Sequence, residues 1–365
     1  MQIIPIIKPC LGQHEADLLL ETIRDNWITG GLKVKQFEER IAGFTDSKYA
    51  IACCNGTMAL YMGLVAMGIK PGDEVIVPDF TFIASANACI LAGAVPVFCD
   101  VDKQTFNIDV ESAEKVLTKK TRAIMPVHIY GQSADMHKVL NFALDHNLLV
   151  IEDAAQGVCV KFCDHPVGAL GDVGALSFYS DKTITSGEGG MVLTNNPEIA
   201  DRALMLKHQG RRERGVYLHE SIGYNFRMTD LSAAIGLAQL DKLYDIVKSK
   251  KRIEWRYRNR LHGTEGVGLP YVDPKGFNVP FRVNVLVDNP EGLSQHLDSK
   301  LIGSMRFFYP LHRQPCYKYM NLKDDCFPNT IWAYEHGLSL PSYTELRDEQ
   351  IDYVCEAVKA FAETR

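Results

Sequence analysis

Between Tyr49 and Thr194 the sequence alternates short, β-rich apolar runs with longer helical stretches, and this alternation constrains the fold more than any other feature. Several of the β-rich runs are continuously apolar, as is typical of strands buried on both faces of a sheet. We expect strands at Tyr49–Cys53, Glu74–Val77, Val95–Cys99, Ala123–Pro126, Leu148–Glu152, Ala175–Tyr179 and Met191–Thr194. Because no helix fits between the last two, the pattern predicts an α/β fold with a mixed, mostly parallel sheet sandwiched by helices.

The helical stretches complete this arrangement. They are predicted at Gly12–Arg24, Val34–Phe44, Met58–Met67, Ala84–Ala92, Val110–Leu117, Ala134–His146 and Asn196–Lys207. Thr229 can cap a further helix with apolar residues at i, i+3, i+4 spacing, and we expect it to run on through the charged stretch 248–260. A chain of 365 residues exceeds what one hydrophobic core usually organises. The sequence therefore predicts a large domain, residues 1–245, and a smaller C-terminal α/β domain, residues 246–365.

Composition excludes several classes of function. Lys and Arg number 39 against 45 Asp and Glu, so the net charge is −6, whereas a nucleic-acid binder normally has a basic balance. No apolar run approaches the roughly 20 residues of a membrane helix. The ten cysteines are scattered, without zinc-site spacing or a recognisable secretory leader. We expect a cytoplasmic protein with reduced thiols, no metal site, no nucleic-acid partner and no membrane partner.

Five features with chemical potential follow one another along the predicted domain. They are the turn Asn55-Gly56-Thr57 at the start of a helix, the aromatic Phe82, the acid pair Glu152-Asp153 at a strand end, Ser177, and Lys182 before a glycine-rich turn. Taken singly, each has an ordinary explanation, since a Gly-Thr turn is usually a helix cap and a lone lysine is usually a solvated loop residue. Their order is more informative than any one of them.

The set matches the needs of one cofactor. A lysine that condenses with an aldehyde, a carboxylate that keeps a pyridine nitrogen protonated and a cradle for a phosphate together suit pyridoxal 5′-phosphate. The helix start at Gly56-Thr57 offers backbone N–H groups to the phosphate. Lys182, once released, would be the base that moves a proton between carbon atoms.

In this order the residues resemble the DegT/DnrJ/EryC1/StrS sugar aminotransferases, within the type I (aspartate aminotransferase) fold of pyridoxal-phosphate-dependent transferases. The resemblance implies a large, mostly parallel sheet with a smaller C-terminal domain. Motifs in family order cover about two thirds of the chain. They are Trp27–Gly31, Pro71–Pro78, Thr81–Asn87, Val127–Gly131, Glu152–Gln156, Ser177–Tyr179, Lys182, Gly187–Gly190 and Gly223–Thr229.

The resemblance also implies a role for each cofactor residue. Lys182 would form the internal aldimine, and Asp153 would pair with the pyridine nitrogen. Gln156 would contact the ring hydroxyl, and Phe82 would stack on the ring. The phosphate would be held by Gly56, Thr57, the backbone of Met58, Ser177 and Asn225. Because Asn225 would reach in from a neighbouring subunit, the resemblance implies a homodimer with shared active sites.

Lys182 also bears on the reaction. Some relatives have histidine at this position and resemble a 3-dehydratase, so the lysine favours transamination. The implied substrates are glutamate and a nucleotide-linked 4-keto-6-deoxy sugar, with GDP-4-keto-6-deoxymannose favoured. Candidate substrate contacts are Trp27, Thr29, Arg306, Tyr309 and His312.

One segment departs from the pattern of those relatives. Ser304-Met305-Arg306 stands in place of Thr-Arg-Pro, so that the arginine is displaced by one position, and residues 277–288 match poorly. Two alternatives therefore stay open. One is an aminotransferase for another keto sugar, linked to UDP or dTDP. The other is a non-catalytic protein of the same fold that senses a sugar nucleotide or regulates a partner, although such a sensor has no need of Lys182 together with Asp153 and Gln156.

Overall fold

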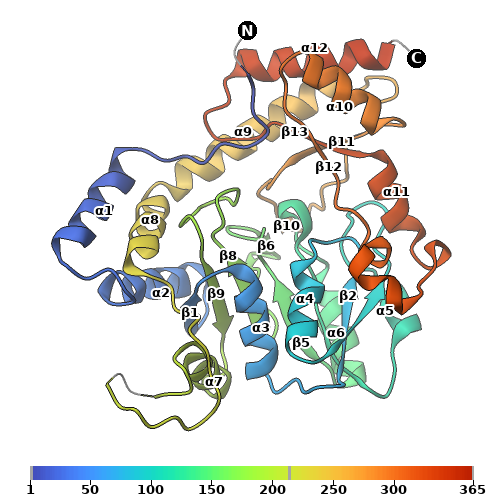
Figure 1. Ribbon diagram of the computed structural model, residues 1–365. Coiled ribbons are helices and arrows are strands. Elements are labelled where there is room, and N and C mark those ends of the chain that lie inside the picture. Colours follow the sequence, from blue (N-terminus) through green and yellow to red (C-terminus); the bar gives the residue numbers. More distant parts are fainter. Residues whose placement is uncertain (1–2, 213–214, 364–365) are drawn as a thin grey trace.

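A seven-stranded sheet forms the centre of the larger part of the computed structural model, which describes residues 3–212 and 215–363 (Figure 1). Its strands run in the order β1-β9-β8-β5-β4-β2-β3, and among these seven β9 alone is antiparallel to its neighbours. The strands are β1 (Tyr49–Cys53), β2 (Glu74–Pro78), β3 (Val95–Cys99), β4 (Thr121–Ile124), β5 (Leu149–Asp153), β8 (Val173–Ser177) and β9 (Gly190–Thr194). The sheet is therefore mixed and mostly parallel, as predicted.

Helices cover both faces of this sheet. Successive residues of a strand point to opposite faces, so in β2 the side chain of Ile76 joins one apolar cluster while Val75 and Val77 join the other. The first cluster includes residues of α2 (Leu32–Thr45), α5 (Val110–Val116), α6 (Met136–His146) and α8 (Asp230–Asp241). The second includes residues of α3 (Gly56–Ala66), α4 (Ala84–Leu91) and α7 (Pro197–Lys207). Burial on both sides explains why the strand sequences are continuously apolar.

A second, smaller unit stands over one end of the large sheet (Figure 1). It has an antiparallel sheet in the order β11-β13-β12, formed by β11 (Val283–Leu286), β13 (Gly337–Leu340) and β12 (Met305–Arg306). Its helices are α9 (Leu243–Leu261), α10 (Pro290–Ser299) and α12 (Asp348–Glu363). Side chains from all three helices form its apolar core, among them Tyr257, Leu297 and Val354.

The two parts are more interwoven than a division between residues 245 and 246 implies, and that boundary falls inside α9. The beginning of the chain, predicted to belong to the large domain, pairs with the small unit: Ile4 N–H donates to Leu301 at 2.9 Å, and Gly303 N–H donates to Ile4 at 2.8 Å. α1 (Gln13–Arg24) then packs on α8 of the large part (Figure 1).

Residues of the predicted small domain also return to the large part. The 3₁₀ turns η2 (Leu311–Arg313), η3 (Pro315–Met320) and η4 (Asp324–Cys326) precede α11 (Pro328–His336). In this region Leu311, Tyr317 and Phe327 pack in the cluster that contains α3 and α4. A short sheet in the order β10-β6-β7 further joins the two parts, through β10 (Gly276–Phe277), β6 (Lys161–Phe162) and β7 (His165–Pro166).

The helix predicted from Thr229 through residues 248–260 is two helices, so that prediction was wrong. Thr229 does cap α8, where its side chain accepts the N–H of Ser232, but α8 ends at Asp241 and α9 begins at Leu243. The break at Lys242 is fixed by tertiary contacts, because Lys242 Nζ donates to the carbonyl of Cys10 at 2.6 Å. The remaining predicted boundaries of these strands and helices differ from the observed ones by at most two residues. Within the described ranges, no helix has both the length and the apolar character needed to cross a membrane.

Candidate active site

A cavity of about 840 Å³ opens at the carboxyl ends of β5 and β8, between the large sheet and the small unit. Ligands of α/β proteins bind at this edge of the sheet. Ten of the sequence-predicted site residues line it: Gly56, Thr57, Met58, Phe82, Asp153, Gln156, Ser177, Lys182, Arg306 and Tyr309. Among the described residues, no group of three or more His, Cys, Asp or Glu side chains is arranged to hold a metal ion.

The start of α3 forms an anion cradle at one end of the cavity. Its first amides, from Gly56 and Thr57, have no carbonyl of their own helix to bond. The Met58 N–H is already donated to the side chain of Asn55 at 2.9 Å, so Met58 has less to offer a phosphate than the sequence implied. A Cβ atom on Gly56 would lie 2.8 Å from Cβ of Ser177, and glycine is therefore required for the close approach of helix and strand.

Asp153 is the last residue of β5 and Gln156 follows it shortly after, both on the cavity wall. The Asp153 carboxylate is almost fully buried and accepts hydrogen bonds from the Ser85 hydroxyl at 2.6 Å and the Ala155 N–H at 3.1 Å. Gln156 Oε1 accepts the N–H of Tyr130 at 2.6 Å, which leaves its Nε2 hydrogens as donors. An oriented carboxylate and an amide donor suit a protonated ring nitrogen and a ring oxygen.

Lys182 lies on the loop that follows β8, where its backbone N–H donates to the carbonyl of Tyr179 at 3.0 Å. Nζ is 3.5 Å from Asp181 Oδ1 and 4.5 Å from the ring centroid of Phe281. Burial lowers the pKa of Lys182, while Asp181 and Asp153 oppose this effect. The lowered pKa favours the neutral amine, which is the form that attacks an aldehyde or accepts a proton.

Aromatic and cationic side chains form the opposite wall. Phe82 is 57% exposed although large and apolar, and its ring lies 6.2 Å from that of Phe308. The ring of Tyr130 stacks on Phe308 at 5.4 Å. Arg306 is held by the carbonyl of Tyr334, to which Nη2 donates at 2.7 Å. An exposed ring such as that of Phe82 can cover a planar ligand.

Four predicted site residues lie outside this cavity, namely Trp27, Thr29, Asn225 and His312. The first three are exposed, and Asn225 pairs with His208 in a short bridge. His312, expected to contact substrate, is instead buried away from the cavity: Nδ1 is 2.6 Å from Asp79 Oδ2 and Nε2 is 3.0 Å from Asp324 Oδ1. Within one chain, His312 therefore has the geometry of a structural residue that ties η2 to the end of β2.

Sequence reasoning also missed four residues that build the site: Ser85, Tyr130, Asp181 and Arg282. Ser85 and Tyr130 lie inside motifs that were recognised, but no spacing rule indicated that one holds Asp153 and the other Gln156. Asp181 directly precedes Lys182, and this adjacency was an available signal. Arg282 lies in the poorly matching stretch 277–288, so no pattern pointed to it.

The cradle, the oriented carboxylate, the exposed ring and the buried lysine all face one cavity, and this donor set fits pyridoxal phosphate. Residues 9–359 match the DegT/DnrJ/EryC1/StrS aminotransferase family. The chain belongs to this family. Members are pyridoxal-phosphate-dependent aminotransferases, so the family, fold, enzyme class and cofactor predicted from the sequence are confirmed.

Individual relatives are similar over nearly their whole length. The chain is 39% identical to a GDP-perosamine synthase from Escherichia coli O157:H7, covering 99% of each protein. It is 40% identical to a GDP-perosamine synthase from Caulobacter vibrioides, covering 97% of each. A solved structure from Streptococcus pneumoniae, described as a sugar aminotransferase in its PLP form, superposes with a TM-score of 0.95 at 26% identity, covering 100% of this chain and 99% of the other.

Proposed function

We propose that this chain is a GDP-perosamine synthase, which transfers the amino group of glutamate to the C4 keto carbon of GDP-4-keto-6-deoxymannose. The observation that carries the proposal is the near full-length identity of 39% and 40% to two GDP-perosamine synthases. Lys182, buried at the cavity wall, gives the chain the residue that separates transamination from a non-catalytic binding role.

Lys182 is the proposed proton carrier of the reaction. Pyridoxal phosphate, when bound, supplies an electron sink for the carbanion left when a carbon loses its proton. In the glutamate half, neutral Lys182 Nζ would accept the proton from the α-carbon and deliver it to the bound cofactor. In the sugar half it would take a proton back from the cofactor and deliver it to C4 of the sugar. The lowered pKa of Lys182 favours the neutral amine that this role needs.

The other site residues bind and orient the cofactor and the sugar nucleotide. The amides of Gly56 and Thr57, with the Ser177 hydroxyl, bind the phosphate. Asp153, oriented by its own hydrogen bonds, accepts the ring N–H, and the Gln156 amide donates to the ring oxygen. Phe82 covers the ring face, while Arg306 and Tyr309 meet the sugar nucleotide. These assignments are supported by the common cavity that all of them line.

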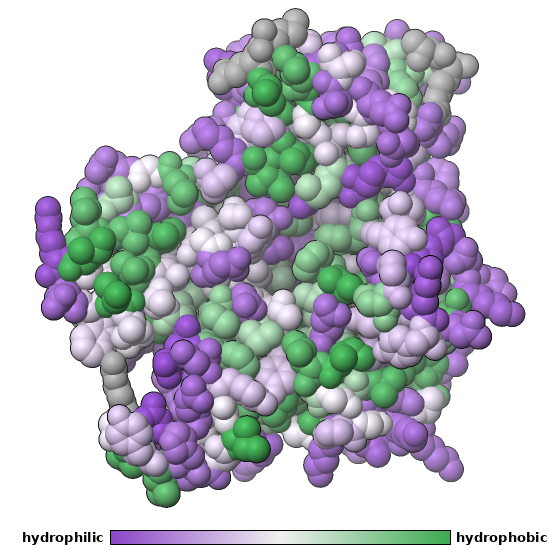
Figure 2. All heavy atoms as spheres, viewed as in Figure 1, coloured by the Kyte–Doolittle hydropathy of each residue, from purple (hydrophilic) through white to green (hydrophobic). Residues whose placement is uncertain are grey.

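Trp27, Thr29 and Asn225 are proposed to act across a homodimer interface. Asn225 is exposed and does not line the cavity of its own chain, which leaves it accessible to a second subunit. Hydrophobic side chains also gather on the surface over α1 and its neighbours (Figure 2). Large exposed apolar residues of α1 and the segment that follows it are Leu20, Ile23, Ile28 and Leu32, and the loop between α7 and α8 exposes Tyr217, Leu218 and Ile222. An apolar surface of this kind marks a protein interface.

Product analysis tests the proposal. Purified protein with pyridoxal phosphate and glutamate is incubated separately with GDP-, UDP- and dTDP-linked 4-keto sugars and a UDP-linked 3-keto sugar, and amino products are identified by mass. We expect amination of GDP-4-keto-6-deoxymannose, and none by Lys182→Ala, which should stay folded. A larger kcat/KM for another sugar would overturn the substrate assignment. Amination of none of the four would favour the sensor.

The proposed contribution of Asn225 to the active site of a second subunit is tested separately. Asn225→Ala should weaken retention of pyridoxal phosphate, measured by absorbance after dialysis, while light scattering still reports a dimer. A fully active monomer would contradict the cross-subunit role of Asn225.

A further inference from the structure

The loop that carries Lys182 is tied to the small unit by one ion pair. Arg282 Nη2 is 3.1 Å from Asp181 Oδ2, while Lys182 Nζ is 3.5 Å from the other oxygen, Oδ1. Asp181 and Arg282 are both largely buried, with side-chain exposures of 17% and 8%. The Asp181 carboxylate therefore stands between two cations in a region that excludes most water.

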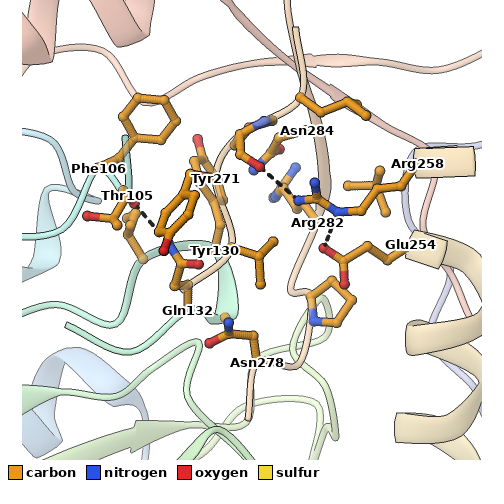
Figure 3. A pocket seen from close by; sticks show the side chains of 17 residues that line it. Thr105, Phe106, Tyr130, Gln132, Glu254, Arg258, Tyr271, Asn278, Arg282 and Asn284 are labelled. Atoms are coloured by element: carbon orange, nitrogen blue, oxygen red, sulfur yellow. Dashed lines mark hydrogen bonds and ion pairs between the residues drawn. The ribbon is translucent and has the colours of Figure 1, made fainter. Parts of the chain in front are cut away.

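The two cations also share an aromatic neighbour. Lys182 Nζ lies 4.5 Å and Arg282 Cζ lies 4.9 Å from the centroid of the Phe281 ring. Arg282 forms part of the wall between the main cavity and a second, smaller cavity of about 50 Å³, whose far side is lined by Arg258 and Glu254 (Figure 3). Its guanidinium is thus held beside Lys182 from the small-unit side.

A third cation stands behind this pair. Lys250 of α9 is almost completely buried, and its Nζ donates to the carbonyls of Pro280 at 3.3 Å and Phe281 at 3.4 Å. Together with Asp181 and Lys182 it lines a cavity of about 30 Å³. Burial lowers the pKa of Lys250 to about 8, against the opposing effect of Asp181. Lys250 therefore adds positive potential on the side of Asp181 that faces away from the main cavity.

Arg282 also contacts the small sheet. Arg282 Nη1 lies 2.6 Å from the sulfur of Met305 on β12. A thioether is a weak acceptor, so the strong bond of Arg282 is the one to Asp181.

We propose that Asp181 and Arg282 are positioning residues that hold the Lys182 amine at the cavity and set its charge, with Lys250 as a buried second cation behind Asp181. The proposal rests on the proposed role of Lys182. Asp181 alone would hold Lys182 as a charged ammonium, which cannot act as a base. Burial and Arg282 offset that effect, and Lys250 adds to them while it is protonated, so Asp181 can orient the amine while the amine loses its proton readily.

The electrostatic effects on Lys182 have opposite signs. Asp181 and Asp153 raise the pKa of Lys182, and Arg282 lowers it. Apart from Lys250, the other titratable groups that line the two cavities touching Lys182 are Lys8, Cys10, Tyr130, Tyr179, Glu188, Arg306, Tyr309 and Tyr343. Because these eight groups are unchanged in the variants below, their electrostatic effect on Lys182 is the same in every comparison.

The test measures Lys182 in the full-length, cofactor-free chain. Its reactivity toward acetic anhydride is followed against pH by mass spectrometry of the Lys182 peptide, for wild type, Arg282→Met, Lys250→Met and Asp181→Asn. We expect the midpoint to shift to higher pH in Arg282→Met and Lys250→Met, and to lower pH in Asp181→Asn. Opposite shifts distinguish an electrostatic role from general damage, which would move all variants the same way.

Two controls sharpen the comparison. Arg282→Lys keeps the charge and should restore a midpoint near that of wild type, and it also serves if Arg282→Met fails to fold. Arg258→Met removes a partly exposed guanidinium that lines the neighbouring small cavity and is bound to Glu254 at 3.2 Å rather than to Asp181, and it should leave the midpoint unchanged. With pyridoxal phosphate bound, the pH profile of the glutamate half-reaction should shift in the same directions as the labelling midpoints.

Unshifted midpoints, or shifts of the same sign in Arg282→Met and Asp181→Asn, would overturn the proposal. A rise in KM for glutamate without a midpoint shift would also overturn it, since Arg282 would then be a substrate-binding residue. The labelling uses no sugar nucleotide, so its result stands apart from the substrate assignment. Failure to aminate GDP-4-keto-6-deoxymannose would leave the labelling shifts in place.

Discussion

Replacing Glu152 with glutamine should remove a large part of the stability of the fold. Glu152 is fully buried at the end of β5, next to Asp153, and its carboxylate accepts four hydrogen bonds. Oε1 accepts the N–H groups of Leu170 at 2.8 Å and Gly171 at 2.7 Å. Oε2 accepts the Gly168 N–H at 2.8 Å and lies 3.0 Å from His128 Nε2.

The protonation of His128 follows from its second contact. His128 Nδ1 lies 3.1 Å from the Ala134 N–H and must accept it, so in the neutral ring the proton is on Nε2, which donates to Glu152. A glutamine has one acceptor oxygen and a donor –NH₂ group. In either orientation of the amide, two of the four donors lose their acceptor and face other hydrogens. Each lost bond to a charged acceptor costs about 1.5–3 kcal/mol, so the variant should lose about 3–6 kcal/mol.

Urea denaturation of full-length wild type and Glu152→Gln measures this loss, which is comparable with the total stability of about 5–15 kcal/mol of a typical domain. Glu198→Gln is a matched control, because Glu198 is 77% exposed and pairs only with Arg202 on the same helix. Its effect should stay within about 0.5 kcal/mol. A loss below about 1 kcal/mol in Glu152→Gln would refute the reasoning, because the Glu152 carboxylate could not then accept four hydrogen bonds in a buried position.

Three further changes test other parts of the structure. Gly131→Ala should cost more than about 3 kcal/mol in urea denaturation, because Gly131 has φ of +83° and a Cβ atom would lie 1.8 Å from the carbonyl oxygen of Val279. Burial opposes the charged form of His312, but its two acidic partners outweigh this and raise its pKa above 6.5. The charged ring therefore contributes stability that is complete below about pH 6.5 and is lost as pH rises through the raised pKa, and His312→Gln should flatten this decline in Tm. Ser85→Ala removes a hydrogen-bond donor to Asp153. That bond should contribute about 1.5 kcal/mol to the binding of pyridoxal phosphate, so the variant should bind the cofactor about tenfold more weakly. An unchanged Kd would contradict the role given to the serine.

The strands were predicted well because their sequence signal is local. Tyr49–Cys53 and Val95–Cys99 have the predicted bounds, since each is an apolar run ended by turn residues. The break at Lys242 could not be predicted, because neither glycine nor proline marks it and a contact with the distant Cys10 fixes it. The local sequence pattern therefore predicts where helices and strands lie, whereas a break within a helical stretch can depend on contacts with residues far away in the sequence.

The same distinction applies to the residues of the candidate site, some of which could be predicted from the sequence and some of which could not. Asp153 and Lys182 could be found because each follows a strand that ends at the same sheet edge. His312 could not be placed from sequence, since its burial depends on Asp79, which lies 233 residues earlier in the chain. Arg282 reaches Asp181 across 101 residues, and no periodicity links two such positions. Residues that act by positioning another residue are therefore the ones that cannot be identified from a single sequence.

The return of residues 311–327 to the core of the large part has a consequence for how the molecule comes apart. Leu311, Tyr317 and Phe327 are almost completely buried among side chains of α3, α4 and β3, while β12 before them and β13 after α11 belong to the small unit. Pulling residues 246–363 away as a rigid body would expose these three side chains to water, at a cost of about 1.5–3 kcal/mol each. The two parts should therefore melt in a single transition, and fragments cut inside α9 should not fold separately. A closing motion over the cavity cannot therefore be a movement of residues 246–363 as one rigid body.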